Sequence, residues 1–121
     1  MAVTVSRIPF SGSTDGKGIK ITQTATAGDI IHTATSESGA GDADEIWIYA
    51  YNSHSADVTL TLEWGGTSAP DDNIKQAIPY QAGLVLVAPG LPLRNSLVVK
   101  AFAATANVIV LYGWVNRIIE T

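Results

Sequence analysis

Residues 57–64 read Asp-Val-Thr-Leu-Thr-Leu-Glu-Trp, so polar and apolar side chains alternate along the whole stretch. A period of two places alternate residues on opposite faces of a β-strand. One face of this strand is predicted to pack on a core and the other to face solvent, as in an antiparallel sheet with one wetted side. The predicted core-facing residues are Val58, Leu60, Leu62 and Trp64.

Apolar or alternating segments of similar length, separated by turn residues, occupy the rest of the chain. Strands are predicted at 18–22, 29–33, 45–51, 57–64, 74–78, 84–87, 97–102 and 108–115. No segment keeps a 3.6-residue period over a helical length. About eight strands with turns every ten or so residues predict a single-domain, all-β antiparallel sandwich. The long end loops favour a jelly-roll-like arrangement over an immunoglobulin-like one.

The first sixteen residues differ from the segments that follow. They include Pro9, show no helical period and end in the turn signal at 15–16. Proline removes a backbone donor and favours an extended residue before it. We expect an extended N-terminal arm over 1–16, followed by a β-sandwich domain over 17–121. A frayed terminus is the alternative, although a free tail has no use for the apolar Ile8 and Phe10.

Composition excludes several classes of protein. Of 121 residues, 46% are hydrophobic and 15% charged, which is too apolar for disorder and poor in charge for a free-standing monomer. Seven scattered basic residues against eleven acidic ones give a net charge of −4, without the basic stripe that nucleic acids require. The absence of cysteine excludes disulfides and zinc–thiolate sites. No signal peptide or bilayer-spanning apolar run is recognised, so we expect synthesis in a reducing cytoplasm and no membrane partner.

Three predicted strands carry more apolar side chains than one buried face needs. Segments 46–51, 84–87 and 108–115 are apolar on both faces. Leaving the second faces wet would cost several kcal/mol at about 25 cal/mol per Å². We therefore predict a homo-oligomer, with a monomer covered by its own loops as the alternative. The candidate partner-contact residues are Arg7, Ile8, Pro9, Phe10, Trp47, Tyr49, Tyr51, Ile109, Leu111, Tyr112 and Trp114.

Catalytic and metal-binding patterns are incomplete. His32 and His54 accompany no nucleophile elbow. The spacing of Asp42 and Asp44 is that of a calcium loop's start, but the later Gly and Glu of such a loop are missing. We expect no catalytic residue, metal or cofactor. Aromatic platforms also bind sugars, but packing is the better interpretation for tryptophans inside apolar strands: Trp47, Trp64 and Trp114.

Several stretches resemble small virion structural proteins of tailed bacteriophages and prophages. They are Ser-Arg-Ile-Pro-Phe-Ser-Gly-Ser at 6–13, Gly-Ile-Lys-Ile at 18–21, Asp-Glu-Ile-Trp-Ile-Tyr-Ala at 44–50, Leu-Glu-Trp-Gly-Gly-Thr at 62–67, Ala-Pro-Gly-Leu at 88–91 and Val-Asn-Arg-Ile at 115–118. The resemblance spans nearly the whole chain but contains no motif with chemical meaning. No functional residue is carried over from it.

Membership of that class implies a virion component, and the chain's size favours a capsid decoration (cement) protein. Such proteins sit as trimers on the capsid surface and clamp neighbouring subunits of the major capsid protein. The function expected on this basis is stabilisation of the phage head from the outer surface of the shell. The strands that are apolar on both faces would supply the trimer interface, and residues 1–10 would reach capsid protein or a neighbouring copy.

Two alternatives from other classes remain open at this point. One is a tail- or fibre-associated host-recognition module that binds glycans through exposed aromatic residues. The other is an enzyme in which His32 or His54 meets an acid.

Overall fold

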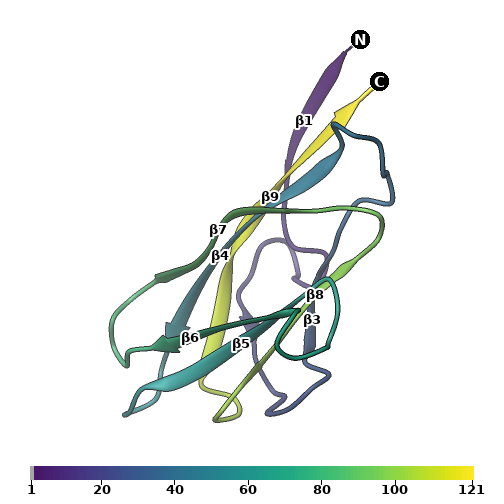
Figure 1. The fold of residues 1–121 in the computed structure, drawn as a ribbon. Coiled ribbons are helices and arrows are strands. Elements are labelled where there is room, and N and C mark those ends of the chain that lie inside the picture. Colours follow the sequence, from purple (N-terminus) through teal and green to yellow (C-terminus); the bar gives the residue numbers. More distant parts are fainter. Residues whose placement is uncertain (1) are drawn as a thin grey trace.

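The structure is a computed structural model that describes residues 2–121. Two antiparallel sheets pack face to face (Figure 1), and no helix in this part of the chain is long and apolar enough to cross a membrane. Sheet A has the order β1 (Val3–Ile8), β9 (Ile109–Glu120), β4 (Ala43–Asn52) and β7 (Val85–Leu93), and the short β2 (Ile19–Lys20) also pairs with β9. Sheet B has the order β3 (Asp29–Thr33), β8 (Val98–Ala103), β5 (Val58–Trp64) and β6 (Asn73–Ile78).

The strand order is that of a jelly roll. With the short β2 set aside, the eight remaining strands numbered along the chain lie in the order 1-8-3-6 in sheet A and 2-7-4-5 in sheet B. The first and last strands are therefore neighbours, and every connection between successive strands except the one from β5 to β6 crosses between the two sheets, as in the double Greek key of a jelly roll. The predicted all-β, single-domain sandwich is confirmed.

The core lies between the sheets, where the inward faces of the strands meet. On β4 the inward residues Ile46 and Ile48 are fully buried, and on β5 so is Leu60. The polar face of β5 is less exposed to solvent than the alternation of polar and apolar residues predicts. Glu63 is 0% exposed because the segment between β2 and β3 lies over it: Thr26 Oγ1 and the amide of Gly28 donate to its carboxylate at 2.5 and 2.7 Å.

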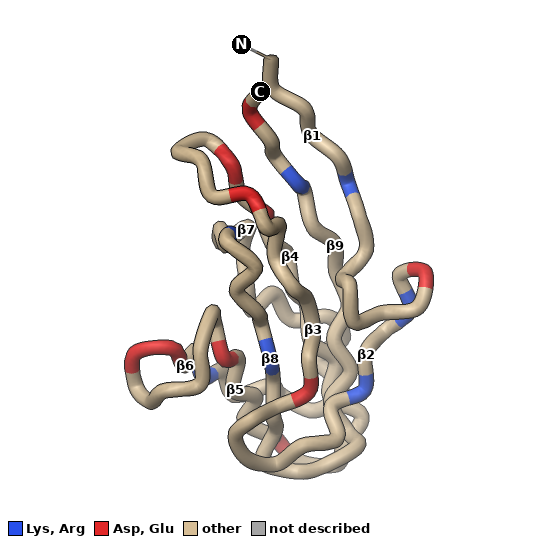
Figure 2. The backbone as a smooth tube through the Cα atoms, turned by 90° about the vertical axis from the view of Figure 1, so that its right-hand side faces the viewer, with Lys and Arg blue, Asp and Glu red and all other residues tan. Residues whose placement is uncertain are grey.

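The N-terminal segment is part of the sandwich. β1 is extended, as expected, but it pairs with β9 along its full length, from Val3 opposite Glu120 to Ile8 opposite Val115. Phe10 then enters the core and is 3% exposed. Residues 3–10 therefore belong to the sandwich, because pairing and burial tie them to it. At one end of the sandwich, β1 and the end of β9, with the start of β4 beside them, project as a ribbon that carries both termini (Figures 1 and 2).

Candidate functional site: an aromatic patch on the outer face of sheet A

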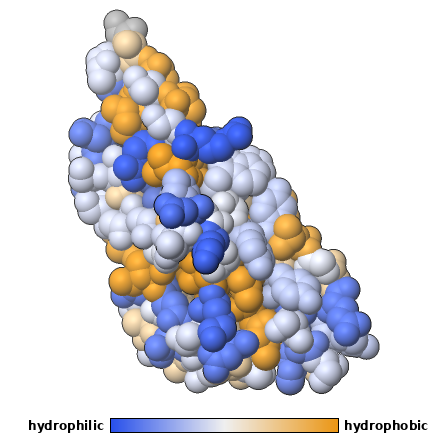
Figure 3. All heavy atoms as spheres, turned by 180° about the vertical axis from the view of Figure 1, so that it is seen from behind, coloured by the Kyte–Doolittle hydropathy of each residue, from blue (hydrophilic) through white to orange (hydrophobic). Residues whose placement is uncertain are grey.

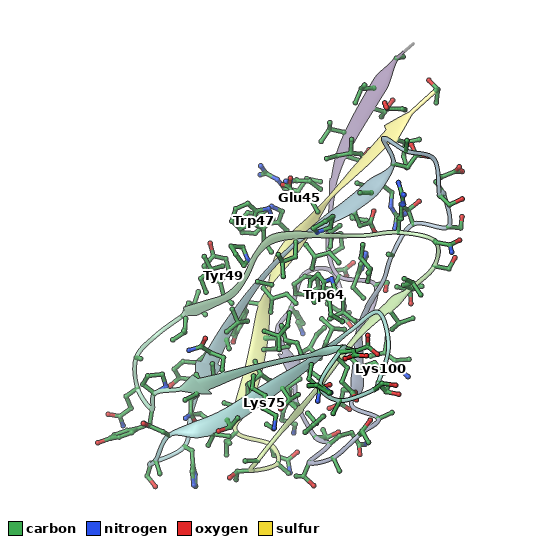
Figure 4. The ribbon with its side chains drawn as sticks, in the orientation of Figure 1. Glu45, Trp47, Tyr49, Trp64, Lys75 and Lys100 are labelled. Carbon is green, nitrogen blue, oxygen red and sulfur yellow. The ribbon has the colours of Figure 1, made fainter. Side chains whose placement is uncertain are left out.

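The outer face of sheet A carries a group of aromatic side chains from its two central strands. Alternate residues of β4 are fully buried or half-buried, which directs the half-buried set outward. Trp47 lies opposite Trp114, and Tyr49 opposite Tyr112. We call these residues, together with Tyr51, the aromatic patch. In Figure 4, Trp47 and Tyr49 project outward from β4, away from Trp64.

The rings of the patch stack on one another. The Trp47 and Trp114 rings are 5.6 Å apart between centroids and tilted by only 12°, and the Tyr49 ring lies 6.0 Å from Trp114 at 27°. Cross-strand aromatic pairs of this kind contribute about 0.5–1.5 kcal/mol beyond the area they bury. The patch is therefore a stiff surface whose rings hold one another in place.

The stack continues onto both flanking strands. The guanidinium carbon of Arg7, on β1, lies 5.9 Å from the centroid of the Trp114 ring, within cation–π range. On β7, Gly90 lies against Trp47: a Cβ at this position would fall 2.9 Å from Cζ2 of the indole. Gly90 also has φ +74°, which favours glycine. Four neighbouring strands thus contribute to one continuous contact.

Polar groups border the patch on the side of the ribbon. Oε1 of Glu45 accepts hydrogen bonds from Nε1 of Trp47 at 3.0 Å and from Nδ2 of Asn116 at 3.1 Å. These two donors, Trp47 first, hold the pKa of Glu45 below its ordinary value. The buried Nε1 of Trp114 has no hydrogen-bond partner within residues 2–121. One indole is thus oriented by a carboxylate, while the other is held by ring contacts.

The patch is partly open to solvent. Tyr112 is 39% exposed, and Leu86, which lies opposite Tyr49 on β7, is 44% exposed. The two tryptophans are half-buried, because each ring covers part of its neighbour. Mutual stacking therefore reduces the apolar surplus inferred from the sequence. The apolar side chains that stay exposed on these three strands, β4, β7 and β9, all lie on sheet A. The segment between β2 and β3 does not cover them, because it packs on Glu63 of sheet B.

The candidate contact residues divide between this surface and the core. Trp47, Tyr49, Tyr51, Tyr112 and Trp114 come together on the outer face, with the exposed Arg7 beside them. Three others are corrected by the structure, because their side chains are buried in the chain's own core and are not accessible to a partner. These are Phe10, Ile109 and Leu111, at 3%, 0% and 0% exposure. Pro9 is exposed, and Ile8 is half-buried against the core.

A buried polar cluster joins the two sheets, and no sequence motif predicted its full set of residues. Nε2 of His32, on β3, lies 2.7 Å from Oδ2 of Asp44, on β4. Arg117, on β9, donates to both carboxylate oxygens of Asp44 at 2.8 and 2.9 Å, and the amide of Thr35 donates to Oδ2 at 3.1 Å. The histidine and the aspartate are 1% and 0% exposed. Such a cluster is satisfied internally, as a buried ion pair requires.

The hydrogen bonds of the cluster fix its protonation. The amide of Ser11 donates to Nδ1 of His32 at 3.0 Å, so Nε2 carries the proton and donates to Asp44. Burial lowers the pKa of His32 more than Asp44 raises it. Burial acts to raise the pKa of Asp44, but hydrogen bonds from Arg117 and His32 outweigh this and lower it. The stable state is a neutral imidazole beside an ionised carboxylate.

Serine, histidine and aspartate thus meet here, but with different contacts from those of a catalytic triad. Ser11 reaches the imidazole through its backbone amide, while its hydroxyl accepts a hydrogen bond from the amide of Thr33 at 2.7 Å. Both imidazole nitrogens of His32 are occupied. The cluster ties the segment after β1 to strands β3, β4 and β9.

The acidic residues considered for calcium bind protein groups. Asp42 accepts hydrogen bonds from the amides of Gly39 and Glu120, at 3.2 and 2.8 Å, and so attaches its loop to β9. Within residues 2–121, no three His, Cys, Asp or Glu side chains are grouped as a metal site requires. An open cavity of about 600 Å³ lies beside this loop, and its Arg94 donates to the carbonyls of Gly39 and Asp42.

Comparisons with protein-family models, with curated proteins and with solved structures found no match to this chain. The resemblance to phage virion proteins therefore stays an expectation from the sequence.

Proposed function

We propose that the protein is a capsid decoration (cement) protein of a tailed bacteriophage and that it attaches to the outer surface of the shell through the aromatic patch. The observation that carries the proposal is a stiff, partly exposed aromatic stack on an uncovered face of sheet A, bordered by Arg7, Glu45 and Asn116. Aromatic residues and arginine with a polar rim are the composition of protein–protein interfaces. The role is structural and non-enzymatic.

Attachment of this kind would stabilise the head by adding contact area across joints between subunits of the major capsid protein. A standard interface buries about 1,600 Å², and many copies on one shell multiply weak individual contacts. Because the rings already hold one another, little side-chain freedom is lost on binding. The sequence resemblance further implies trimers on the shell, with the virion as the site of action.

Glycan binding is the second candidate, because aromatic rings beside Arg7, Glu45 and Asn116 are also the side chains that sugar sites use. The ring contacts favour protein instead. A sugar stacks on an open ring face, whereas Trp114 lies between Trp47 on one neighbouring strand and Arg7 on the other. Jelly rolls occur in both viral capsid and lectin domains, so the fold does not separate the two candidates.

Co-sedimentation with expanded, undecorated capsids of the phage that encodes the protein tests the proposal. We expect the wild-type chain to pellet with capsids and Tyr49→Ala/Tyr112→Ala to lose at least tenfold in affinity. Lys75→Ala, on sheet B, is the matched surface control and should bind as wild type (Figure 4). Undiminished binding by the tyrosine variant, or sugar binding on a glycan array without capsid binding, would overturn the proposal.

A further inference from the structure

β1 is an open edge of sheet A. Within residues 2–121 it pairs only with β9, and its other side has no strand partner. The opposite edge, β7, contains Pro89 and Pro92 and two register shifts, which are features that block further pairing. β1 has no proline and no bulge along its six residues. Apolar side chains also reach the surface at this tapered end of the molecule (Figure 3), where Val3 and Val5 are 58% and 62% exposed.

The backbone of β1 alternates between bonded and free groups. Ala2 and Thr121 exchange two hydrogen bonds, at 3.0 and 2.9 Å. Because bonded pairs alternate in an antiparallel ladder, the even-numbered residues of β1 bond to β9. Val3, Val5 and Arg7 therefore direct their N–H and C=O groups toward the open edge. Three consecutive pairing positions are available to another strand.

We infer that this edge pairs with the same edge of a second copy, antiparallel about a two-fold axis at Val5. Val5 is the middle one of the three outward-bonding residues, so this register uses all of them. Val5 then exchanges two hydrogen bonds with the partner's Val5, and Val3 does so with the partner's Arg7. The two sheets A become one continuous sheet across the pair of molecules.

The side chains of the outer face match in this register. The central row holds Ile118 and Val5 of each copy, because Val5 lies opposite Ile118. The next row places Glu120 and Val3 of one copy beside the partner's Arg7. Glu120 and the partner's Arg7, which carry opposite charges, are therefore separated only by Val3. The two-fold axis produces a second, identical row on the other side of Val5. A register centred on Arg7 would instead place two arginines directly opposite each other.

On the other face of the ribbon, Thr4 would lie opposite the partner's Ser6. Both side chains are small, polar and exposed, so they can lie opposite each other on the face where the paired β1 strands meet solvent. The pairing does not depend on capsid binding. It requires an even number of copies, so trimers with free β1 edges would join into hexamers.

A single cysteine at the axis tests the register, because the natural chain has none. In a bonded antiparallel pair the two Cα atoms at position 5 would be about 5.5 Å apart, within disulfide range. We expect Val5→Cys to oxidise to a covalent dimer. Val3→Cys is the matched control: it is similarly exposed, but about 13 Å would separate the two thiol positions along the strands, so little dimer should form. Equal cross-linking of both variants, or none of Val5→Cys, would overturn the inference.

Sedimentation equilibrium tests the assembly without a cross-link. We expect an even number of copies in the wild type and half that number in Val5→Lys, which opposes two lysines at the axis. The melting curve should confirm that Val5→Lys is folded, since this side chain is exposed. A wild-type monomer or trimer, or an unchanged mass for Val5→Lys, would contradict the pairing. Val5→Lys should still pellet with capsids, so failure of the pairing and failure of capsid attachment are separable.

Discussion

Trp47 of β4 and Trp114 of β9 lie directly opposite each other, and their indoles stack across the outer face of sheet A at 5.6 Å. The pair lies on the side of the sheet that faces away from sheet B, so it adds to stability without being part of the core. It also fixes the shape of the surface that we propose as the binding site. Stability and binding are therefore linked at these two residues.

Removing either indole should destabilise the fold moderately. We expect Trp114→Ala to lower the free energy of unfolding by about 2 kcal/mol, because a half-buried ring and its stacking contacts are lost. In a double-mutant cycle with Trp47→Ala, urea unfolding should give a coupling energy of about 1 kcal/mol. Strictly additive effects would mean that the two rings do not support each other.

Gly90 is expected to be required for the position of Trp47. Gly90→Ala adds a methyl group 2.9 Å from Cζ2 of the indole at φ +74°, so we expect a loss of about 2 kcal/mol in urea and altered tryptophan fluorescence. Gly83→Ala is the control, because φ there is +72° and nothing lies within 4 Å of the added atom. It carries the backbone strain alone, about 1 kcal/mol. If both variants lost the same free energy of unfolding, the Trp47 indole would be able to move away from the added methyl group at no cost.

His32 should make stability depend on pH. Its pKa is lowered in the folded protein, chiefly by burial, so the unfolded chain takes up a proton first as pH falls through 6.5. We therefore expect the free energy of unfolding to decrease below about pH 6.5. His32→Gln, less stable overall, should lose this dependence, whereas His54→Gln should retain it. A wild-type curve that is flat from pH 8 to pH 5 would contradict a neutral, buried His32.

Asp44 should depend on Arg117 for its burial. Because the pKa of Asp44 is lowered in the folded state, its contribution is present above the ordinary carboxyl pKa and is lost only in strong acid. We expect Arg117→Met to cost about 3 kcal/mol at neutral pH, since it leaves a carboxylate of 0% exposure without its cation. Arg7→Met, at the surface, should cost less than 1 kcal/mol. Similar losses in chemical denaturation would show that the buried pair adds no stability.

The sequence predicted the architecture well because each strand carries its own signal. Alternation along 57–64 placed one side of β5 inward, and turn residues separated the strands. Segment 108–115 shows the limit of such reasoning. With apolar residues on both faces, nothing local indicates that Ile109 and Leu111 face the core while Tyr112 and Trp114 face outward. That choice is made by the opposing sheet.

The buried cluster was out of reach for a different reason. Asp44 is 12 residues from His32 and 73 from Arg117, and it stands in an acidic stretch that resembles a turn or a calcium loop. Only the jelly-roll order, which makes the last strand a neighbour of β4, brings the three together. The same strand order explains why residues 3–10 pair and pack instead of forming a free arm, because it places β9 next to β1.

Capsid attachment through the aromatic patch is best tested by side-chain oxidation with hydroxyl radicals, compared between the free protein and the protein bound to undecorated capsids. Tyr112, at 39% exposure, belongs to the proposed contact surface, whereas Tyr80, at 49%, lies outside the aromatic patch. We expect capsid binding to slow oxidation of Tyr112 strongly and to leave that of Tyr80 unchanged. Oxidation of Tyr112 at the same rate in both states would contradict this attachment.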